Sequence, residues 1–253
     1  MSTERRVALV TGAGRGLGRA IALGLAEDGF DVAVNYHRDK ESADATVAAI
    51  EGLGRRSGAF RAAVQSADED AAMVEAVVAA FGQLDAFVHN AGVSNRGRTV
   101  ADTDPADLEK VMGVHAMGAH HLCRLVVPHL RERPRGDVVL ISSQSTRSHD
   151  PNAAPYTMGK AALEALAFSL ANEEARAGIR VNVVAAGLMN TDMGRRLVKG
   201  VFGFDDIHQL DSRIALGRVS EPEDVADTVR FLVSDRGALI TGQRIGVDGG
   251  GLR

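Results

Sequence analysis

The chain has 253 residues and a formal net charge of −4 without a basic block, which argues against nucleic acid as its main partner. Hydrophobic residues make up 45% of it and aromatic residues only 4%, a composition typical of a sheet packed between Ala- and Leu-rich helices. The single cysteine, Cys123, excludes an internal disulfide and indicates a reducing compartment. Strand and helix patterns alternate without a Pro- or Ser-rich linker, so residues 1–253 are predicted to form one α/β domain.

The sequence shows no segment typical of export or of membrane insertion. Its start, MSTERRVALVTGAG, runs from a short polar stretch directly into an apolar strand and lacks an apolar signal segment. No run approaches the ~20 apolar residues of a membrane span. We therefore expect a soluble, cytoplasmic protein that does not bind membranes.

The first predicted strand, Val7–Val10, leads into a glycine-rich turn and then an amphipathic helix. In TGAGRGLG, residues 11–18, the glycines allow a sharp turn, a close approach to a phosphate and close packing of the helix on the sheet. The open amides at a helix start also favour an anion. The turn therefore predicts a dinucleotide phosphate site, with a purely structural turn as the alternative. Its candidate residues are Gly12, Arg15, Gly16, Leu17 and Gly18.

The second predicted strand, Asp31–Tyr36, bears on the choice of dinucleotide. A protein that selects NAD usually ends this strand with an acid that binds the ribose hydroxyls and would repel a 2′-phosphate. This chain has Asn35 there, with His37 and Arg38 just after it. Arg15 adds a second cation, so the sequence predicts NADP(H), with the two arginines as phosphate contacts. Ordinary surface arginines are the alternative.

A tyrosine and a lysine are the main catalytic candidates. The apolar run Val138–Ile141 indicates a buried strand, and Tyr156 and Lys160 lie one turn apart on the next predicted helix. Free tyrosine has a pKa of about 10, and an ammonium held nearby favours the phenolate and lowers that pKa. Such a pair suits the acid/base chemistry of carbonyl reduction, although the same spacing also occurs on helices by chance.

The order and spacing of these motifs resemble the short-chain dehydrogenase/reductase family. That family carries a Tyr, a Lys four residues later and a Ser thirteen residues earlier, which here are Tyr156, Lys160 and Ser143. The resemblance implies that Tyr156 protonates the carbonyl oxygen as hydride arrives and that Ser143 hydrogen-bonds this oxygen. It implies that Lys160 lowers the tyrosine pKa and holds the nicotinamide ribose. It also implies a Rossmann-like, doubly wound parallel sheet with helices on both faces.

Two further family motifs recur with one substitution each. HNAG, residues 89–92, is similar to the family's NNAG, which assigns Asn90, Ala91 and Gly92 to the floor of the cofactor site. The family's Pro-Gly is Ala186-Gly187 here, and the resemblance places Gly187 and the later Thr191 at the nicotinamide side. Losing the proline removes a backbone restraint, so this loop is expected to be somewhat more mobile.

Two departures from the family affect the predicted site. Ala63 stands where the family commonly has an Asp that contacts adenine, which leaves Val64 and a substitute such as Asp68 as candidates. His115, on a long helix predicted over Leu108–Leu125, replaces an Asn that orients a proton-relaying water. Because histidine can hold water and titrates near neutrality, we hypothesise that His115 keeps or replaces the relay. A lowered or lost activity is the alternative.

The segment at about 188–216 breaks the strand-and-helix rhythm and is predicted to be a substrate lid, with a surface helix pair as the alternative. Its apolar candidates are Leu197, Phe202 and Phe204, and its cations for an acidic carrier or coenzyme are Arg195, Arg196 and Lys199. The adjacent His120 and His121 point to different sides of one helix, so no metal is predicted. The closing segment, LITGQRIGVDGG, resembles a subunit-packing segment of the family and implies a homodimer or homotetramer.

Taken together, the motifs predict an NADPH-dependent oxidoreductase that reduces a ketone carbonyl. The nearest resemblance is to 3-oxoacyl-thioester reductases and related ketoreductases, so the expected substrate is a small or thioester-carried ketone. Two alternatives stay open at this point. One is an alcohol or sugar dehydrogenase that works oxidatively, and the other is a non-catalytic NADP-binding protein.

Overall fold

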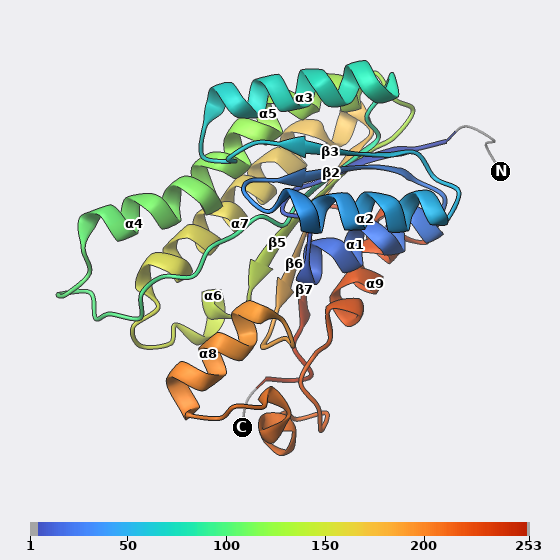
Figure 1. The fold of residues 1–253 in the computed structure, drawn as a ribbon. Helices are drawn as coiled ribbons and strands as arrows, with labels where there is room; N and C mark the ends of the chain where they lie inside the picture. The colour runs from blue at the N-terminus through green and yellow to red at the C-terminus, as the bar shows by residue number, and fades with distance from the viewer. Residues whose placement is uncertain (1–4, 252–253) are drawn as a thin grey trace.

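The computed structural model describes residues 5–251, in which seven strands form one parallel sheet in the order β3-β2-β1-β4-β5-β6-β7 (Figure 1). The strands are β1 (Val7–Val10), β2 (Asp31–Tyr36), β3 (Ser57–Arg61), β4 (Ala86–His89), β5 (Gly136–Ser143), β6 (Ile179–Ala186) and β7 (Arg244–Val247). The chain order reverses between β1 and β4, which are hydrogen-bonded neighbours. In open α/β sheets, ligands bind outside the carboxyl ends of the strands at this switch point.

Helices cover both faces of the sheet, because successive side chains of each strand point to opposite sides. In β1, Val7 and Leu9 pack into one apolar layer and Ala8 and Val10 into the other. The first layer contains α3 (Ala67–Phe81), α5 (Gly118–Arg131) and α7 (Ala154–Glu174). The second contains α1 (Gly16–Glu27), α2 (Lys40–Gly52) and α9 (Pro222–Val233). The predicted doubly wound parallel fold is therefore confirmed (Figure 1).

The helix predicted over Leu108–Leu125 is interrupted. It consists of α4 (Pro105–Met112), a five-residue π-helical turn η1 (Gly113–Met117) and α5. The wide turn lies where a β-carbon at Gly118 would collide with the carbonyl oxygen of Val64, so the helix passes close to the chain that leaves β3. Such π-turns frequently occur at functional sites, and this one carries the buried His115.

Two other boundaries differ from expectation. Apolar residues near Phe60–Val64 predict the third strand, but β3 spans Ser57–Arg61, because the chain turns after Ala62 towards Ser66, which caps α3. The segment at 188–216 is partly helical, with α8 (Asp192–Phe202) and the 3-10 turn η3 (Ile207–Arg213) packed around a small apolar cluster of their own. In the view of Figure 1 this region lies below the carboxyl ends of β5 to β7. The short helix α6 (Ser145–Ser148) follows β5 in the chain.

The remaining short turns are η2 (Ala175–Ala177), after α7, and η4 (Asp235–Gly237), after α9. Among the helices of residues 5–251, none combines the length and apolar character that crossing a membrane requires.

Candidate active site

The glycine turn after β1 has the backbone geometry expected of a phosphate cradle. Gly12 and Gly16 have φ angles of 62° and 52°, in the left-handed region that glycine tolerates best. At Gly18, a β-carbon would collide with the carbonyl oxygen of Gly12. Gly12 and Gly16 are therefore favoured by their left-handed backbone and Gly18 by its close approach to Gly12, and the turn brings the start of α1 close to the sheet.

The start of α1 is open to an anion. Arg15 occupies the N-cap position without capping the helix through its side chain, and the first turn contains no acid. Helix amides left open in this way carry partial positive charge and bind phosphate groups. A β-carbon at Gly16 would lie 3.6 Å from Cγ2 of Thr191, so the cradle faces the start of α8. These residues fit the diphosphate of a dinucleotide.

Buried amide side chains hold this turn in place. The side chain of Asn35 accepts a hydrogen bond from Gly12 N at 3.1 Å and donates to the carbonyls of Phe60 and Ala62, both at 3.2 Å. Because its oxygen and both N–H groups have partners in the fold and the residue is 1% exposed, Asn35 connects β1, β2 and β3. The contacts show a brace for the glycine turn, and the predicted direct contact with the cofactor stays a prediction.

Asn90 and Thr11 form a second brace at the switch point. Asn90 Nδ2 donates to the carbonyl oxygens of Thr11 and Gly12, at 2.9 and 3.3 Å. The hydroxyl of Thr11 in turn accepts from the amides of Asn90 and Ala91, at 2.9 and 3.0 Å. The sequence interpretation did not single out Thr11, although its place directly before the first glycine was the available signal. Together these bonds fix the segment that starts at Asn90 and continues through Ala91 and Gly92 against the glycine turn.

The predicted 2′-phosphate contacts lie at the surface on one side of the cradle. Arg15 Nη1 is 3.9 Å from Asp39 Oδ2, so the glycine turn meets the turn after β2 that carries Arg38 and the half-buried His37. Asp39 caps α2 by accepting from Ser42 N at 3.0 Å. Both arginines are exposed. The structure thus brings Arg15 next to the turn that carries Arg38, as the NADP prediction requires.

The adenine side is apolar where the family usually has an acid. Ala63 and Val64 are both 5% exposed and lie between the end of β3 and the start of α3. Ala63 N donates to Glu69 Oε2 at 3.0 Å. Asp68 lies in the first turn of α3, next to Glu69. Val64 borders the predicted adenine position, and its contact with the base stays a prediction.

Ser143, Tyr156 and Lys160 converge at the carboxyl end of β5. Tyr156 and Lys160 lie on α7, and Lys160 Nζ is 5.9 Å from the centroid of the Tyr156 ring. Lys160 is 3% exposed and donates to the carbonyl oxygen of Ile141 at 2.6 Å. Ser143, the last residue of β5, hydrogen-bonds Tyr156 through its side chain. The structure therefore assembles the three predicted catalytic residues.

Burial dominates the ionisation of this cluster. Desolvation raises the pKa of Tyr156 above its ordinary value of 10.0, and the hydrogen bond from Ser143 opposes that rise. The same cause lowers the pKa of Lys160 to about 7, against the attraction of Glu164. Burial therefore sets the net direction of the tyrosine pKa, and the expected lowering of this pKa by Lys160 stays a prediction. A tyrosine with a raised pKa stays protonated at neutral pH, which suits a proton donor.

His115 packs edge-on against Tyr156, with ring centroids 5.2 Å apart and an interplanar angle of 85°. Its Nε2 lies 2.8 Å from the carbonyl oxygen of Val93, so the neutral ring donates there and leaves Nδ1 as a buried acceptor without a partner. Burial, then the charge of Lys160, lowers the pKa of His115 well below its ordinary value. The expectation that His115 titrates near neutrality is therefore wrong, and any relay would use the neutral ring.

Glycines on two sides make room for the His115 ring. A β-carbon at Gly92 would lie 2.8 Å from His115 Cε1, and one at Gly159 would lie 3.0 Å from His115 Cβ. The absence of a side chain at Gly92 thus leaves space for the His115 ring. Next to it, His89 is fully buried, lies 3.4 Å from the Thr11 hydroxyl through Nδ1 and has its pKa lowered to about 3, mainly by burial. It therefore acts structurally rather than as a base near neutrality.

The predicted nicotinamide-side residues lie where β6 ends. Gly187 N donates to the carbonyl oxygen of Val247, and a β-carbon at Gly187 would lie 2.5 Å from Cβ of Asp248. Thr191 caps α8 by accepting from Gly194 N at 3.1 Å. Gly187 therefore lets the segment after β7 approach closely, and Thr191 anchors the predicted lid beside the glycine turn. Their contacts with the nicotinamide stay predictions.

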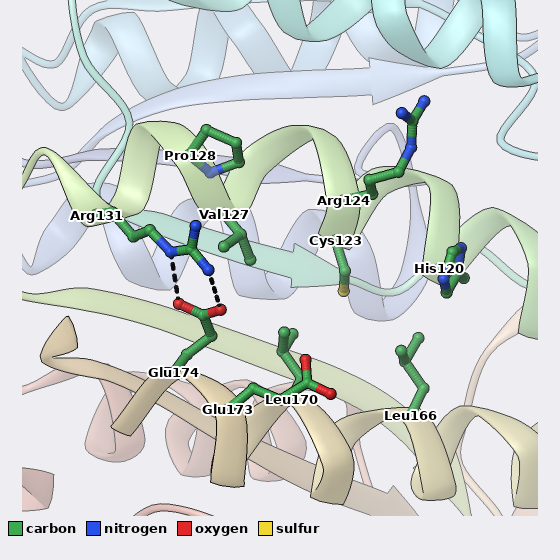
Figure 2. Close-up of a pocket in the computed structure, with 10 residues that line it drawn as sticks. All are labelled: His120, Cys123, Arg124, Val127, Pro128, Arg131, Leu166, Leu170, Glu173 and Glu174. Carbon is green, nitrogen blue, oxygen red and sulfur yellow. Dashed lines mark hydrogen bonds and ion pairs between the residues drawn. The ribbon is translucent and has the colours of Figure 1, made fainter. Parts of the chain in front are cut away.

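A surface pocket lies away from this cluster, between α5 and α7 (Figure 2). It shares no lining residue with the candidate site and includes the ion pair of Arg131 with Glu174, at 2.5 and 2.8 Å. Burial raises the pKa of Cys123 in its wall to about 12, so this thiol is a poor nucleophile. Across residues 5–251, no group of three or more His, Cys, Asp or Glu side chains could hold a metal ion.

Known proteins resemble this chain over nearly its whole length. The family model described as enoyl-(acyl carrier protein) reductase matches residues 12–251. The 3-oxoacyl-[acyl-carrier-protein] reductase FabG of Staphylococcus aureus is 39% identical over 244 residues, 96% of each chain. The protein of the same name from Thermotoga maritima is 34% identical over 250 residues, 99% of each chain.

Solved structures show the same fold. A dehydrogenase/reductase from Sinorhizobium meliloti 1021 superimposes with a TM-score of 0.90 at 34% identity, covering 98% of this chain and 96% of the other. A short chain dehydrogenase from Burkholderia cenocepacia J2315, solved in complex with NADP, gives 0.88 at 35% identity, covering 97% of both chains. A doubly wound sheet with a glycine cradle and a Ser-Tyr-Lys cluster defines a dinucleotide-dependent oxidoreductase. The chain belongs to the short-chain dehydrogenase/reductase family.

Proposed function

We propose that this oxidoreductase uses NADPH to reduce the ketone of a 3-oxoacyl thioester, with Tyr156 as the proton donor. The observation that carries the proposal is the convergence of Ser143, Tyr156 and Lys160 at the carboxyl edge of the sheet, next to an open phosphate cradle. The names of the Staphylococcus aureus and Thermotoga maritima relatives, both 3-oxoacyl-[acyl-carrier-protein] reductases, support the substrate class.

The proposed chemistry divides into hydride and proton transfer. NADPH supplies the hydride that reaches the carbonyl carbon. Ser143 holds the carbonyl oxygen by a hydrogen bond, and Tyr156 gives its hydroxyl proton to that oxygen as negative charge develops. Lys160, fixed by the carbonyl of Ile141, holds the nicotinamide ribose and stabilises the tyrosinate that remains. The product is a secondary alcohol, and water returns the proton to Tyr156.

NADP(H) is the proposed cofactor, held by the glycine turn and by the residues around it. Its 2′-phosphate is assigned to Arg15 and Arg38, which flank the turn after β2. No acid occupies the end of β2, where Asn35 is buried as a brace. The NADP bound to the Burkholderia cenocepacia relative supports the same choice. We expect Arg38→Ala to weaken the binding of NADPH ~10-fold while leaving the binding of NADH unchanged.

The predicted lid forms the substrate side of the proposed site. Leu197 and Met193 on α8 are 54% and 39% exposed, which leaves apolar surface free for an acyl chain. Arg196, one residue before Leu197, adds a cation on the same helix for an acidic carrier or coenzyme, and Thr191 fixes its start. The homo-oligomeric and cytoplasmic expectations stay predictions.

A second reaction, reduction of an enoyl thioester, follows from the description of the matching family model. The Ser-Tyr-Lys cluster favours the ketone, because its serine and tyrosine hydrogen-bond an oxygen at the carbon that accepts hydride. An oxidative alcohol or sugar dehydrogenase uses the same groups in reverse, and a non-catalytic cofactor-binding protein has no need of them together.

The test is NADPH oxidation followed by absorbance with acetoacetyl, crotonyl and cyclic or aromatic ketone substrates, with NADH in parallel. We expect turnover with the acetoacetyl thioester and NADPH, slower turnover with NADH, and none with the crotonyl thioester. Turnover of the crotonyl thioester alone would replace ketone reduction by enoyl reduction. Tight NADPH binding without turnover of any carbonyl substrate would favour the non-catalytic alternative.

A further inference from the structure

A half-buried glutamate on α7, Glu164, accepts hydrogen bonds from the segment that carries Ser143. Glu164 Oε1 accepts from Ser142 Oγ at 2.6 Å and from Thr146 Oγ1 at 2.9 Å. It also accepts from Arg244 Nε at 2.9 Å, and the side chains of Glu164 and Arg244 are 13% and 9% exposed. Three donors from β5, α6 and β7 therefore meet on one carboxylate oxygen.

Arg244 holds the same segment from the other side. Its Nη2 donates to the carbonyl oxygen of Ser143 at 3.2 Å, to Gln144 Oε1 at 3.2 Å and to Thr146 Oγ1 at 2.9 Å. The single hydroxyl proton of Thr146 is shared between Glu164 Oε1 and the carbonyl oxygen of Ser143, each 2.9 Å from Thr146 Oγ1. The backbone of Ser143 is thus held from β7 and from the turn that follows it. Its Oγ accepts from Ser145 N at 3.1 Å, and its side chain lowers the pKa of Tyr156 through a hydrogen bond.

Glu164 lies four residues beyond Lys160 and eight beyond Tyr156, on the same face of α7. A helix is a rigid element, so a carboxylate fixed to this face keeps the Ser143 segment at a constant position relative to Tyr156 and Lys160. Arg244 supplies the opposite charge that makes a buried carboxylate tolerable, and either partner alone would leave a buried charge unpaired.

We propose that the Glu164–Arg244 pair positions Ser143 against Tyr156, so that it acts on the reaction without touching the substrate. This inference rests on the proposed function. A pair that served folding alone would bridge elements anywhere in the protein. The Glu164–Arg244 pair instead hydrogen-bonds Ser142, Ser143 and Thr146, which form the segment that carries the candidate catalytic serine.

The test uses the double variant Glu164→Gln/Arg244→Met, which removes the ion pair without changing the net charge. The matched control is Arg131→Met/Glu174→Gln, which removes another arginine–carboxylate pair from the far end of α7. We expect kcat to fall ~10²-fold in the first variant, with the KM for NADPH unchanged, because a shifted serine affects only the reacting carbonyl. The control should keep its kcat within about twofold of the wild type.

A second readout does not depend on turnover. The chain contains two tyrosines, so carbon-13 labelling of the tyrosine ring gives two resonances, and Tyr36→Phe assigns them. Since the Ser143 hydrogen bond lowers the pKa of Tyr156, its loss should move the Tyr156 titration upward by ~1 pH unit. The other titratable neighbours of Tyr156, His115 of η1 and Lys160 of α7, are the same in every variant.

The outcomes separate the two proposals. A Tyr156 titration that is unchanged in the double variant, or a kcat that falls equally in the control, would overturn the positioning role. A wild-type protein that reduces no ketone would overturn the proposed function, yet the tyrosine titration would still support or refute the positioning role. If the double variant does not fold, Arg244→Lys serves instead, because it keeps a cation for Glu164 and removes the bonds to Ser143 and Gln144.

Discussion

The two ends of the sheet use buried charge in opposite ways. At the amino ends of the strands, Asp137 is paired with Arg6 at 2.5 Å, Arg180 at 2.6 Å and Arg135 at 3.3 Å. At the carboxyl ends, Lys160 is buried without a carboxylate in hydrogen-bond contact and donates to a backbone carbonyl. Near it, His115 Nδ1 has no hydrogen-bond partner. The charge of Asp137 at the amino ends is paired with arginines, whereas burial at the carboxyl ends lowers the pKa of Lys160 to about 7.

The difference shows how this fold separates stability from chemistry. Arg6, Arg135 and Arg180 also donate to the carbonyls of Val233 and Gly237, so the amino-end cluster fastens the turn after α9 to the sheet. Perturbed ionisable groups, by contrast, concentrate where reactions occur. We therefore expect variants at the amino ends to change unfolding, and variants at the carboxyl ends to change turnover.

The largest expected effect comes from Tyr156→Phe, which removes the proposed proton donor. We expect kcat to fall ~10³-fold or more, because general acid catalysis contributes ~10²–10⁴-fold and the aromatic ring is retained. NADPH affinity and thermal midpoint should stay near those of the wild type. Full reductase activity in this variant would refute the role of Tyr156.

The next effect lies at the other end of the sheet. Asp137→Asn leaves three arginines without their common carboxylate, so we expect the free energy of unfolding to fall by ~3–5 kcal/mol. Denaturant unfolding measures this loss, and kcat per folded molecule should stay unchanged. A large loss of kcat in a fully folded variant would break the proposed division between the two ends.

The pH dependence of stability tests the burial of Lys160. Its pKa is lowered from 10.5 to about 7 on folding, so between these values the unfolded chain binds the extra proton and stability rises with pH. Between these pH values, the free energy of unfolding of the wild type should rise relative to that of Lys160→Met by up to ~1.4 kcal/mol per pH unit. Parallel curves for the two proteins would mean that Lys160 keeps its ordinary pKa in the fold.

The smallest effect concerns the His115 ring. Gly92→Ala would place a β-carbon against its edge, so we expect kcat to fall ~10-fold through displacement of the ring from Tyr156. The His115→Asn variant lacks the ring edge, so adding Gly92→Ala to it should lower kcat by less than twofold. Equal losses in both backgrounds would exclude His115 as the residue that Gly92 accommodates. An unchanged rate and pH profile in His115→Asn alone would show that His115 has no special role.

Apolar runs predicted most of the strands and helical spacing paired Tyr156 with Lys160, because both patterns depend on neighbouring residues; the family resemblance added Ser143. The π-helical turn η1 lies beside the close approach of Gly118 to Val64, which are far apart in the chain, and no local pattern predicted it. The same applies to the direction of the Tyr156 pKa, which depends on burial by the complete fold. Glu164 and Arg244 were missed because their pairing spans β7 and α7.

The most direct test of the central proposal is to follow a deuterium label from NADPH into the product of an acetoacetyl thioester. We predict that the wild type places the label on C3 of a 3-hydroxyacyl thioester, and that Tyr156→Phe binds NADPH normally but forms almost no product. Label on a saturated acyl chain, or undiminished 3-hydroxyacyl formation by Tyr156→Phe, would contradict the proposed reduction of a ketone through this tyrosine.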